Sequence, residues 1–170
     1  MKKIIILLGF LLLADLAAPA QIQHADTRES LRGLDGVYVV IQIVDEQPAG
    51  ITTNSIETLV TSALVEAGIP TNAVPKKLNG DANLSITVDT LKQQQLDAYI
   101  FTVEVVVTQD VELTRQPHSK WSSAETWRRT LQGITTPDRT DVIEQALKKC
   151  VDAFVADYHA VNPKLSDKKP

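Results

Sequence analysis

The most regularly spaced carboxylates of this chain are Glu104, Asp110 and Glu112, which all fall at even positions of one strand-like segment. Side chains of one parity lie on one face of a β-strand, so these carboxylates are predicted to share a face. Paired carboxylates perform general acid–base chemistry when they lie in a partly desolvated cleft. An open sheet face provides no such cleft, so we interpret the three groups as a solvated acidic face.

Histidine and cysteine form no recognisable metal or nucleophile motif. The spacing of His24, His118 and His159 contains no paired ligand pattern. His159 falls near a predicted helix C-terminus, where a cation suits the macrodipole. The single cysteine, Cys150, falls on an apolar helical stripe and is predicted to be a buried, inert thiol. No nucleophile-elbow serine or glycine-rich phosphate loop occurs, so no catalytic residue, cofactor or metal site is predicted and enzymatic activity is left open.

Aromatic and charged side chains indicate a surface that could bind another protein. Trp127 is predicted to lie in the core, whereas Trp121 falls in or beside a turn and is a better candidate for a contact residue. Together with Glu104, Asp110 and Arg128, Trp121 forms the candidate interaction face of this sequence.

The segment 97–115, DAYIFTVEVVVTQDVELTR, must position most of these residues. Its apolar residues occupy odd positions and its polar residues mostly even ones, which predicts a long strand with one buried face and one wet face. It contains no proline or glycine and many β-branched residues. Because the strand is long, a twist or bulge is expected near 106–109.

Three further strands are predicted at 37–44, 84–91 and 122–131. The first is apolar on both parities, which indicates a central strand covered on both faces. Pairing Val88 with Tyr99 places the apolar residues of both strands on one face and predicts a hairpin.

The last strand can be aligned by its tryptophan. Setting Val111 opposite Trp127 buries the indole and places Asp110 opposite Arg128, where opposite charges are favourable. Two charged residues then fall on the buried parity, Glu125 and Arg129. Either they lie at the margin of the sheet or a bulge shifts the register.

Two amphipathic helices complete the pattern. The first is predicted to begin at Asn54 as N-cap and to end at Gly68. The second has Thr136 as N-cap and Pro137 at its first position. The order β-α-β-β-β-α predicts an α+β fold, a two-layer α/β sandwich in which two helices cover one face of a four-stranded mixed sheet. The opposite face is expected to be open to solvent.

The first twenty residues have the three parts of a secretory signal peptide. Two lysines precede an apolar run from Ile4 to Leu13, and a small-residue site ends at Ala20. The run is too short to span a membrane, so the mature chain is expected to lack a transmembrane segment. This pattern predicts an exported protein, either periplasmic or secreted.

The remaining chain is predicted to contain one domain. We expect a signal peptide at 1–20, a flexible leader at 21–34, a single α/β domain at 35–162 and a polar tail at 163–170. The formal net charge of −4 gives no electrostatic footprint for nucleic acid.

A series of motifs resembles an uncharacterised family of secreted bacterial proteins. The series covers about 31–164 and runs GLDGVYVVIQIVD, AGI, NLSITVDTL, YIFTVEVVV, a TW strand and DYHAVNPK. The layout is also similar to the small α/β domain at the N-terminus of the Tol-Pal propeller protein, although the propeller itself is absent. Both resemblances imply an envelope setting and neither implies a specific chemistry.

Three functional hypotheses follow. The leading one is an exported, non-enzymatic protein-binding or envelope-associated module that contacts an envelope protein through its open sheet face or an unpaired strand edge. The alternative is a small secreted hydrolase or ligand-binding protein with its site in the loop 71–83 after the first helix. The third is a homo-oligomer formed by strand-edge pairing.

Overall fold

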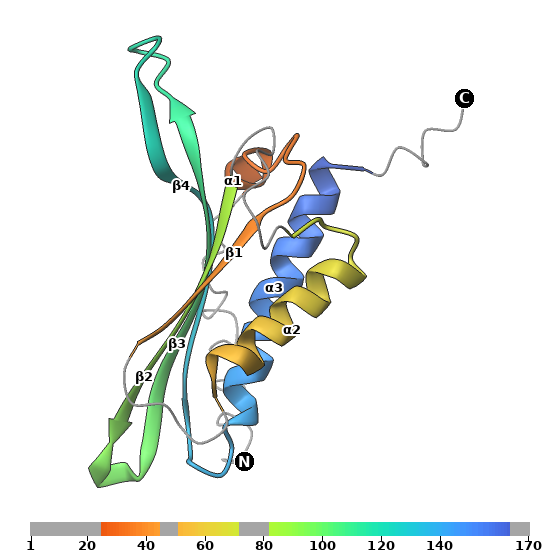
Figure 1. Cartoon of the computed structure of the whole chain (residues 1–170). Coiled ribbons are helices and arrows are strands. Elements are labelled where there is room, and N and C mark those ends of the chain that lie inside the picture. The colour runs from red at the N-terminus through yellow and green to blue at the C-terminus, as the bar shows by residue number, and fades with distance from the viewer. Residues whose placement is uncertain (1–24, 45–50, 72–81, 164–170) are drawn as a thin grey trace, which may run out of the picture.

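Two helices pack on one side of a four-stranded sheet in the computed structural model, which describes residues 25–44, 51–71 and 82–163 (Figure 1). The elements, in chain order, are α1 (Ala25–Glu29), β1 (Tyr38–Val44), α2 (Thr53–Glu66), β2 (Ala82–Gln93), the 3-10 turn η1 (Gln94–Leu96), β3 (Ala98–Glu112), β4 (Lys120–Thr135) and α3 (Asp141–Val161). This is the α+β, two-layer architecture that the sequence predicts.

The sheet has the order β1-β2-β3-β4, with β1 parallel to β2 and the other pairs antiparallel. The prediction that the first strand is central is therefore wrong, because β1 is an edge strand. Val39, Ile41 and Ile43 pack against the core, whereas Val40 and Gln42 on the opposite face are exposed. An apolar run does not distinguish an edge strand from a central one, because both can pack one face against a helix.

The long strand β3 confirms the predicted alternation, since its odd-numbered residues from Tyr99 to Val107 are buried. The predicted irregularity is also present: the register with β4 shifts between Val107 and Thr108 and again between Gln109 and Val111. The extra residues lie in β4, and the first shift falls at Thr126.

Both predicted hairpin registers are wrong by four residues. Val88 pairs with Val103 rather than Tyr99, and Trp127 pairs with Val107 rather than Val111. An even shift keeps every side chain on its predicted face, so the hydrophobic pattern fits either register. The turn decides between them, because η1 and the left-handed Asp97 (φ 42°) close the hairpin at the Gln93–Ala98 pair.

The charged residues of β4 follow from this register. Arg128 is opposite Val106, so the predicted pairing of Arg128 with Asp110 is also wrong. Glu125 and Arg129 are both exposed, and the register shift at Thr126 separates them. The bulge therefore accounts for the exposure of Glu125, and the position of β4 at the sheet margin accounts for the exposure of Arg129.

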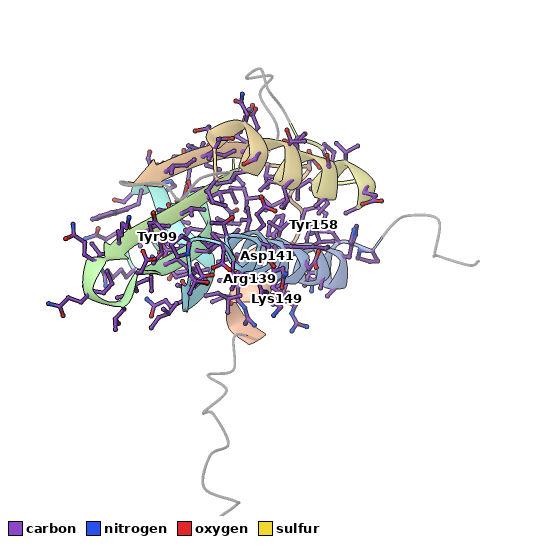
Figure 2. All side chains as sticks on the ribbon, turned by 90° about the horizontal axis from the view of Figure 1, so that it is seen from below. Tyr99, Arg139, Asp141, Lys149 and Tyr158 are labelled. Carbon is purple, nitrogen blue, oxygen red and sulfur yellow. The ribbon has the colours of Figure 1, made fainter. Side chains whose placement is uncertain are left out.

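The helices begin at different residues from those predicted. Thr52, not Asn54, caps α2, in a capping box in which the Ser55 amide donates to the Thr52 hydroxyl (3.1 Å). Thr140 precedes α3, because Thr136 accepts a hydrogen bond from the Arg139 amide (3.0 Å) in a separate turn. Arg139 and Asp141 form an ion pair at the start of α3 (Figure 2).

The predicted end of α2 is confirmed. Gly68 has φ 72°, a conformation in which a residue with a Cβ is strained. The Ile69 amide donates to the Leu64 carbonyl (2.9 Å) and the Gly68 amide to the Val65 carbonyl (2.9 Å), as in a Schellman motif.

The N-terminal segment 25–34 belongs to the core, which the sequence pattern of a leader does not anticipate. Leu31 is fully buried and Leu34 nearly so. The Tyr158 hydroxyl donates to the Leu34 carbonyl (2.7 Å), and the Asn162 side-chain amide donates to the Leu31 carbonyl (2.7 Å). These contacts fix the segment to the C-terminal half of α3.

Replacement of Leu31 tests this attachment. We expect Leu31→Ala to lower the free energy of unfolding, measured in urea, by about 2–5 kcal/mol, because it leaves a cavity in the core. The matched control is Leu96→Ala in the exposed turn η1, which should change stability by less than about 0.5 kcal/mol. Equal small effects would contradict the attachment.

Candidate functional site

Two of the predicted interaction residues, Glu104 and Arg128, meet on the open face of the sheet. Arg128 lies 3.1 Å from a Glu104 oxygen and also forms an ion pair with Glu125. The Thr130 hydroxyl donates to Glu104 (3.2 Å). The hydrogen bond to Glu125 raises the pKa of Arg128. This cluster is fully paired and exposed, so it has the properties of a surface charge network.

The other two predicted residues lie in the far part of the β3–β4 hairpin, which extends beyond the helical layer (Figure 1). Asp110 accepts a hydrogen bond from the Ser123 amide (3.4 Å). Trp121 is 58% exposed and pairs with Val111. Because opposite residues share a face, Trp121 shares the face of Val111 rather than that of Glu104. The four predicted residues therefore do not form one surface.

The feature that sequence reasoning missed is the outer edge of β4. From Trp127 to Thr135 this strand pairs regularly with β3 over nine consecutive residue pairs. No described strand pairs with its other side. A groove of about 370 Å³ lies there, lined by the consecutive β4 residues 125–130 and by Thr27 of α1.

The bulge at Thr126 sets one end of this groove. The Ser30 hydroxyl donates to the Thr126 carbonyl (2.9 Å), so the segment after α1 satisfies a backbone acceptor of β4. The Gln109 amide donates to both the Thr126 hydroxyl (2.6 Å) and the Ser30 carbonyl (3.0 Å). These bonds cover β4 at the bulge and leave the regular stretch 127–135 beyond them.

Asp157 of α3 bonds to residues of both β4 and α1 near the bulge. One carboxylate oxygen accepts a hydrogen bond from the Trp127 indole (3.0 Å), and the other lies 3.0 Å from the Arg28 guanidinium. Trp127 also packs edge-on against Phe154, with ring centroids 5.5 Å apart. These contacts fix the position of Trp127, which lines the groove.

An exposed apolar row crosses the open face at the other end of the β4 edge. Leu91, Ile100 and Ile134 are directly opposite one another on β2, β3 and β4, and are 61%, 39% and 65% exposed. Exposed apolar side chains that are contiguous often mark a contact surface. The row ends at Ile134, on the unpartnered strand.

The described residues offer no catalytic arrangement around the thiol. Cys150 is fully buried on the predicted stripe. Burial raises the pKa of the Cys150 thiol to about 11, and the charge of Arg129 acts in the opposite direction. His159 lies 3.0 Å from the Ala67 carbonyl and joins the ends of the two long helices.

Metal ligands, membrane spans and the segments outside the described residues complete the survey of the site. The described part of the chain contains no group of three or more His, Cys, Asp or Glu that could hold a metal ion. None of its helices is long and apolar enough to cross a membrane. The signal peptide, His24 and most of the loop 71–83 lie outside the described residues.

Comparisons with known proteins define no family for this chain. No family model matches it, and no curated protein matches it in sequence. Among solved structures it is similar to a minor lipoprotein from Acinetobacter baumannii, with 12% identity, a TM-score of 0.38 and coverage of 76% of this chain and 95% of that chain. This likeness is too low to transfer a function, and none of the comparisons supports the likeness to the Tol-Pal propeller domain.

Alkylation of Cys150 tests whether its thiol is buried and unreactive in the folded protein. At pH 8 iodoacetamide should leave Cys150 unmodified in the folded protein and alkylate it in denaturant, as followed by mass spectrometry. Because the unfolded thiol ionises near its ordinary pKa of 9 and the folded one near 11, the thiol stabilises the fold below pH 9 and loses this effect as the pH rises toward 11. Rapid alkylation of the folded protein at pH 8 would contradict an inert thiol.

Proposed function

We propose that this chain is an exported, non-enzymatic protein-binding module of the bacterial envelope, and that it binds its partner along the outer edge of β4. The signal-peptide pattern of residues 1–20 supports export to the periplasm or beyond. The unpartnered edge of β4 is the observation that carries the proposal. An envelope protein with an extended segment is the partner that fits this compartment and this edge.

The physical basis is the hydrogen-bonding capacity of an open strand. Alternate residues of an edge strand direct their N–H and C=O groups away from the sheet, where an extended chain can pair with them. Natural edges are commonly protected by proline, bulges or short length. The stretch 127–135 is nine residues long, regular and free of proline, and among such protections it has only the charges of Arg128 and Arg129. It therefore retains the features of an accepting strand.

The opposite edge of the sheet is a poorer candidate. β1 has seven residues, against sixteen in β4, and the groove described above lies beside β4. Main-chain pairing contributes affinity in proportion to the number of bonds formed, and a neighbouring groove gives side-chain selectivity. Both considerations favour β4.

Site-specific photo-crosslinking tests this function. A photoreactive amino acid at Gln132, which is exposed on the open face of β4, should give one discrete protein adduct when the full chain is expressed and illuminated in its own cells. The same amino acid at Lys148, exposed on α3, is the matched control and should give none. Equal adducts at both positions would contradict binding at the edge.

Proline substitution distinguishes main-chain pairing from side-chain contact. Single prolines at positions 128–134 should be tolerated at alternate positions, where the amide points away from β3. The tolerated variants should keep their melting temperature and lose the Gln132 adduct, because proline removes a donor to the incoming strand. Retention of the adduct in these variants would exclude strand addition.

A further inference from the structure

One of the two arginines in the regular stretch 127–135 of β4 has no ion-pair partner among the described residues. Arg128 forms ion pairs with Glu104 and Glu125. Arg129 is exposed, lines the groove and forms no ion pair with any described residue. The two neighbouring arginines point to opposite faces, since successive residues of a strand alternate. The face of Arg129 is that of Val105, toward the helices.

Arg129 is surrounded by apolar side chains on its face of the sheet. It ends a cross-strand row whose other members are Ile41, Ile86 and Val105, all apolar and on the helix-facing side. The charge of Arg129 also lowers the pKa of the Cys150 thiol in α3, against the larger effect of burial. An arginine at the end of an apolar row, at a groove, is well placed to meet an anion on an added strand.

The other face of the same edge has the opposite character. Ile134 ends the exposed apolar row that begins at Leu91 and passes through Ile100. A fifth strand paired with β4 would place one side chain next to Ile134 on this face and one next to Arg129 on the other, each at a Cβ distance of about 5 Å. The edge therefore presents an unpaired charge at Arg129 and an exposed apolar side chain at Ile134, on opposite faces.

We propose that the partner of β4 is an extended segment of another protein that carries a carboxylate opposite Arg129 and an apolar side chain opposite Ile134, five positions away. This inference rests on the proposed function and adds the chemistry of the partner. The odd spacing follows from the strand, because residues five apart lie on opposite faces. Charge complementarity at Arg129 and burial of Ile134 select this segment over an arbitrary strand.

A second copy of this chain does not fit the same requirement. The regular edge 127–135 has the sequence WRRTLQGIT, which contains no acidic residue. Pairing of two copies through this stretch would leave Arg129 without a carboxylate in every register. The nearest carboxylate in β4, Glu125, lies beyond the bulge whose carbonyl is bonded to Ser30. A second copy that paired through its own β4 therefore does not meet this requirement.

Synthetic nine-residue peptides of alternating valine and threonine provide the probe. One peptide carries glutamate and isoleucine five positions apart, a second has lysine in place of the glutamate, and both are made in the two chain directions. Binding to the full chain is measured by fluorescence anisotropy. The glutamate peptide of one direction should bind about fivefold more tightly than its lysine counterpart, the ratio expected for a partly exposed ion pair.

Charge reversal in the protein tests whether Arg129 is responsible. Arg129→Glu should invert the preference, so that the lysine peptide binds more tightly. Arg115→Glu, which changes the net charge equally at an exposed turn position, is the matched control and should leave the preference unchanged. Ile134→Thr should weaken the isoleucine peptide and have no effect on a peptide with threonine in its place.

Failure of this inference is distinguishable from failure of the proposed function. A Gln132 adduct without any peptide preference, or with a preference that Arg129→Glu does not change, would overturn the partner chemistry and leave the edge as the binding site. The absence of both the adduct and peptide binding would overturn the proposed function as well. An adduct that proves to be a second copy of this chain would also overturn the inferred partner.

Discussion

The central position of β3 is the constraint on which the rest of the structure depends. Val103, Val105 and Val107 are fully buried toward the helices, whereas Thr102 and Glu104 face the solvent side. In this sheet β3 has a hydrogen-bonded neighbour on each side and a covering layer on its apolar face only. β2 and β4 provide the neighbours, and α2 and α3 provide the layer (Figure 1).

This arrangement has a direct consequence at the edge of the sheet. β4 completes the hydrogen bonding of β3, and no described strand does the same for β4. The bulge at Thr126 and the bond from Ser30 protect β4 at one end of the regular stretch. Trp127 marks the boundary, since its indole is fixed to Asp157 while the residues after it pair regularly with β3. The Thr126 carbonyl is therefore bonded by Ser30, whereas the stretch 127–135 has no described strand on its outer side.

The sequence predicts those features that depend on periodicity. The alternation of β3, the apolar stripes of α2 and α3, the burial of Cys150 and the left-handed Gly68 all follow from local residue patterns. Hairpin register does not, because a four-residue slip preserves every face and only η1 and Asp97 decide it. The helix starts differ because Thr52 forms a capping box with Ser55 and because Thr136 accepts from Arg139 in a separate turn before α3.

The groove depends on tertiary contacts that no local pattern encodes. Its position requires that β4 be the last strand, that a bulge fall at Thr126 and that residues near Ser30 return from the N-terminus to cover the bulge. The polar segment 25–34 contains few apolar residues, and the burial of Leu31 is visible only once α3 is in place. The one available signal was the pair of consecutive arginines at 128 and 129, since an edge strand often carries charges on both faces.

Amide hydrogen exchange measured by NMR on the free protein tests the openness of the β4 edge most directly. Along positions 128–135 the account predicts alternation, with slow exchange at amides that donate to β3 and fast exchange at those that point outward. The β3 amides from Tyr99 to Val107 should be slow throughout, because this stretch is paired on both sides. Uniformly slow exchange along β4 would show that the edge is already covered and would contradict the account.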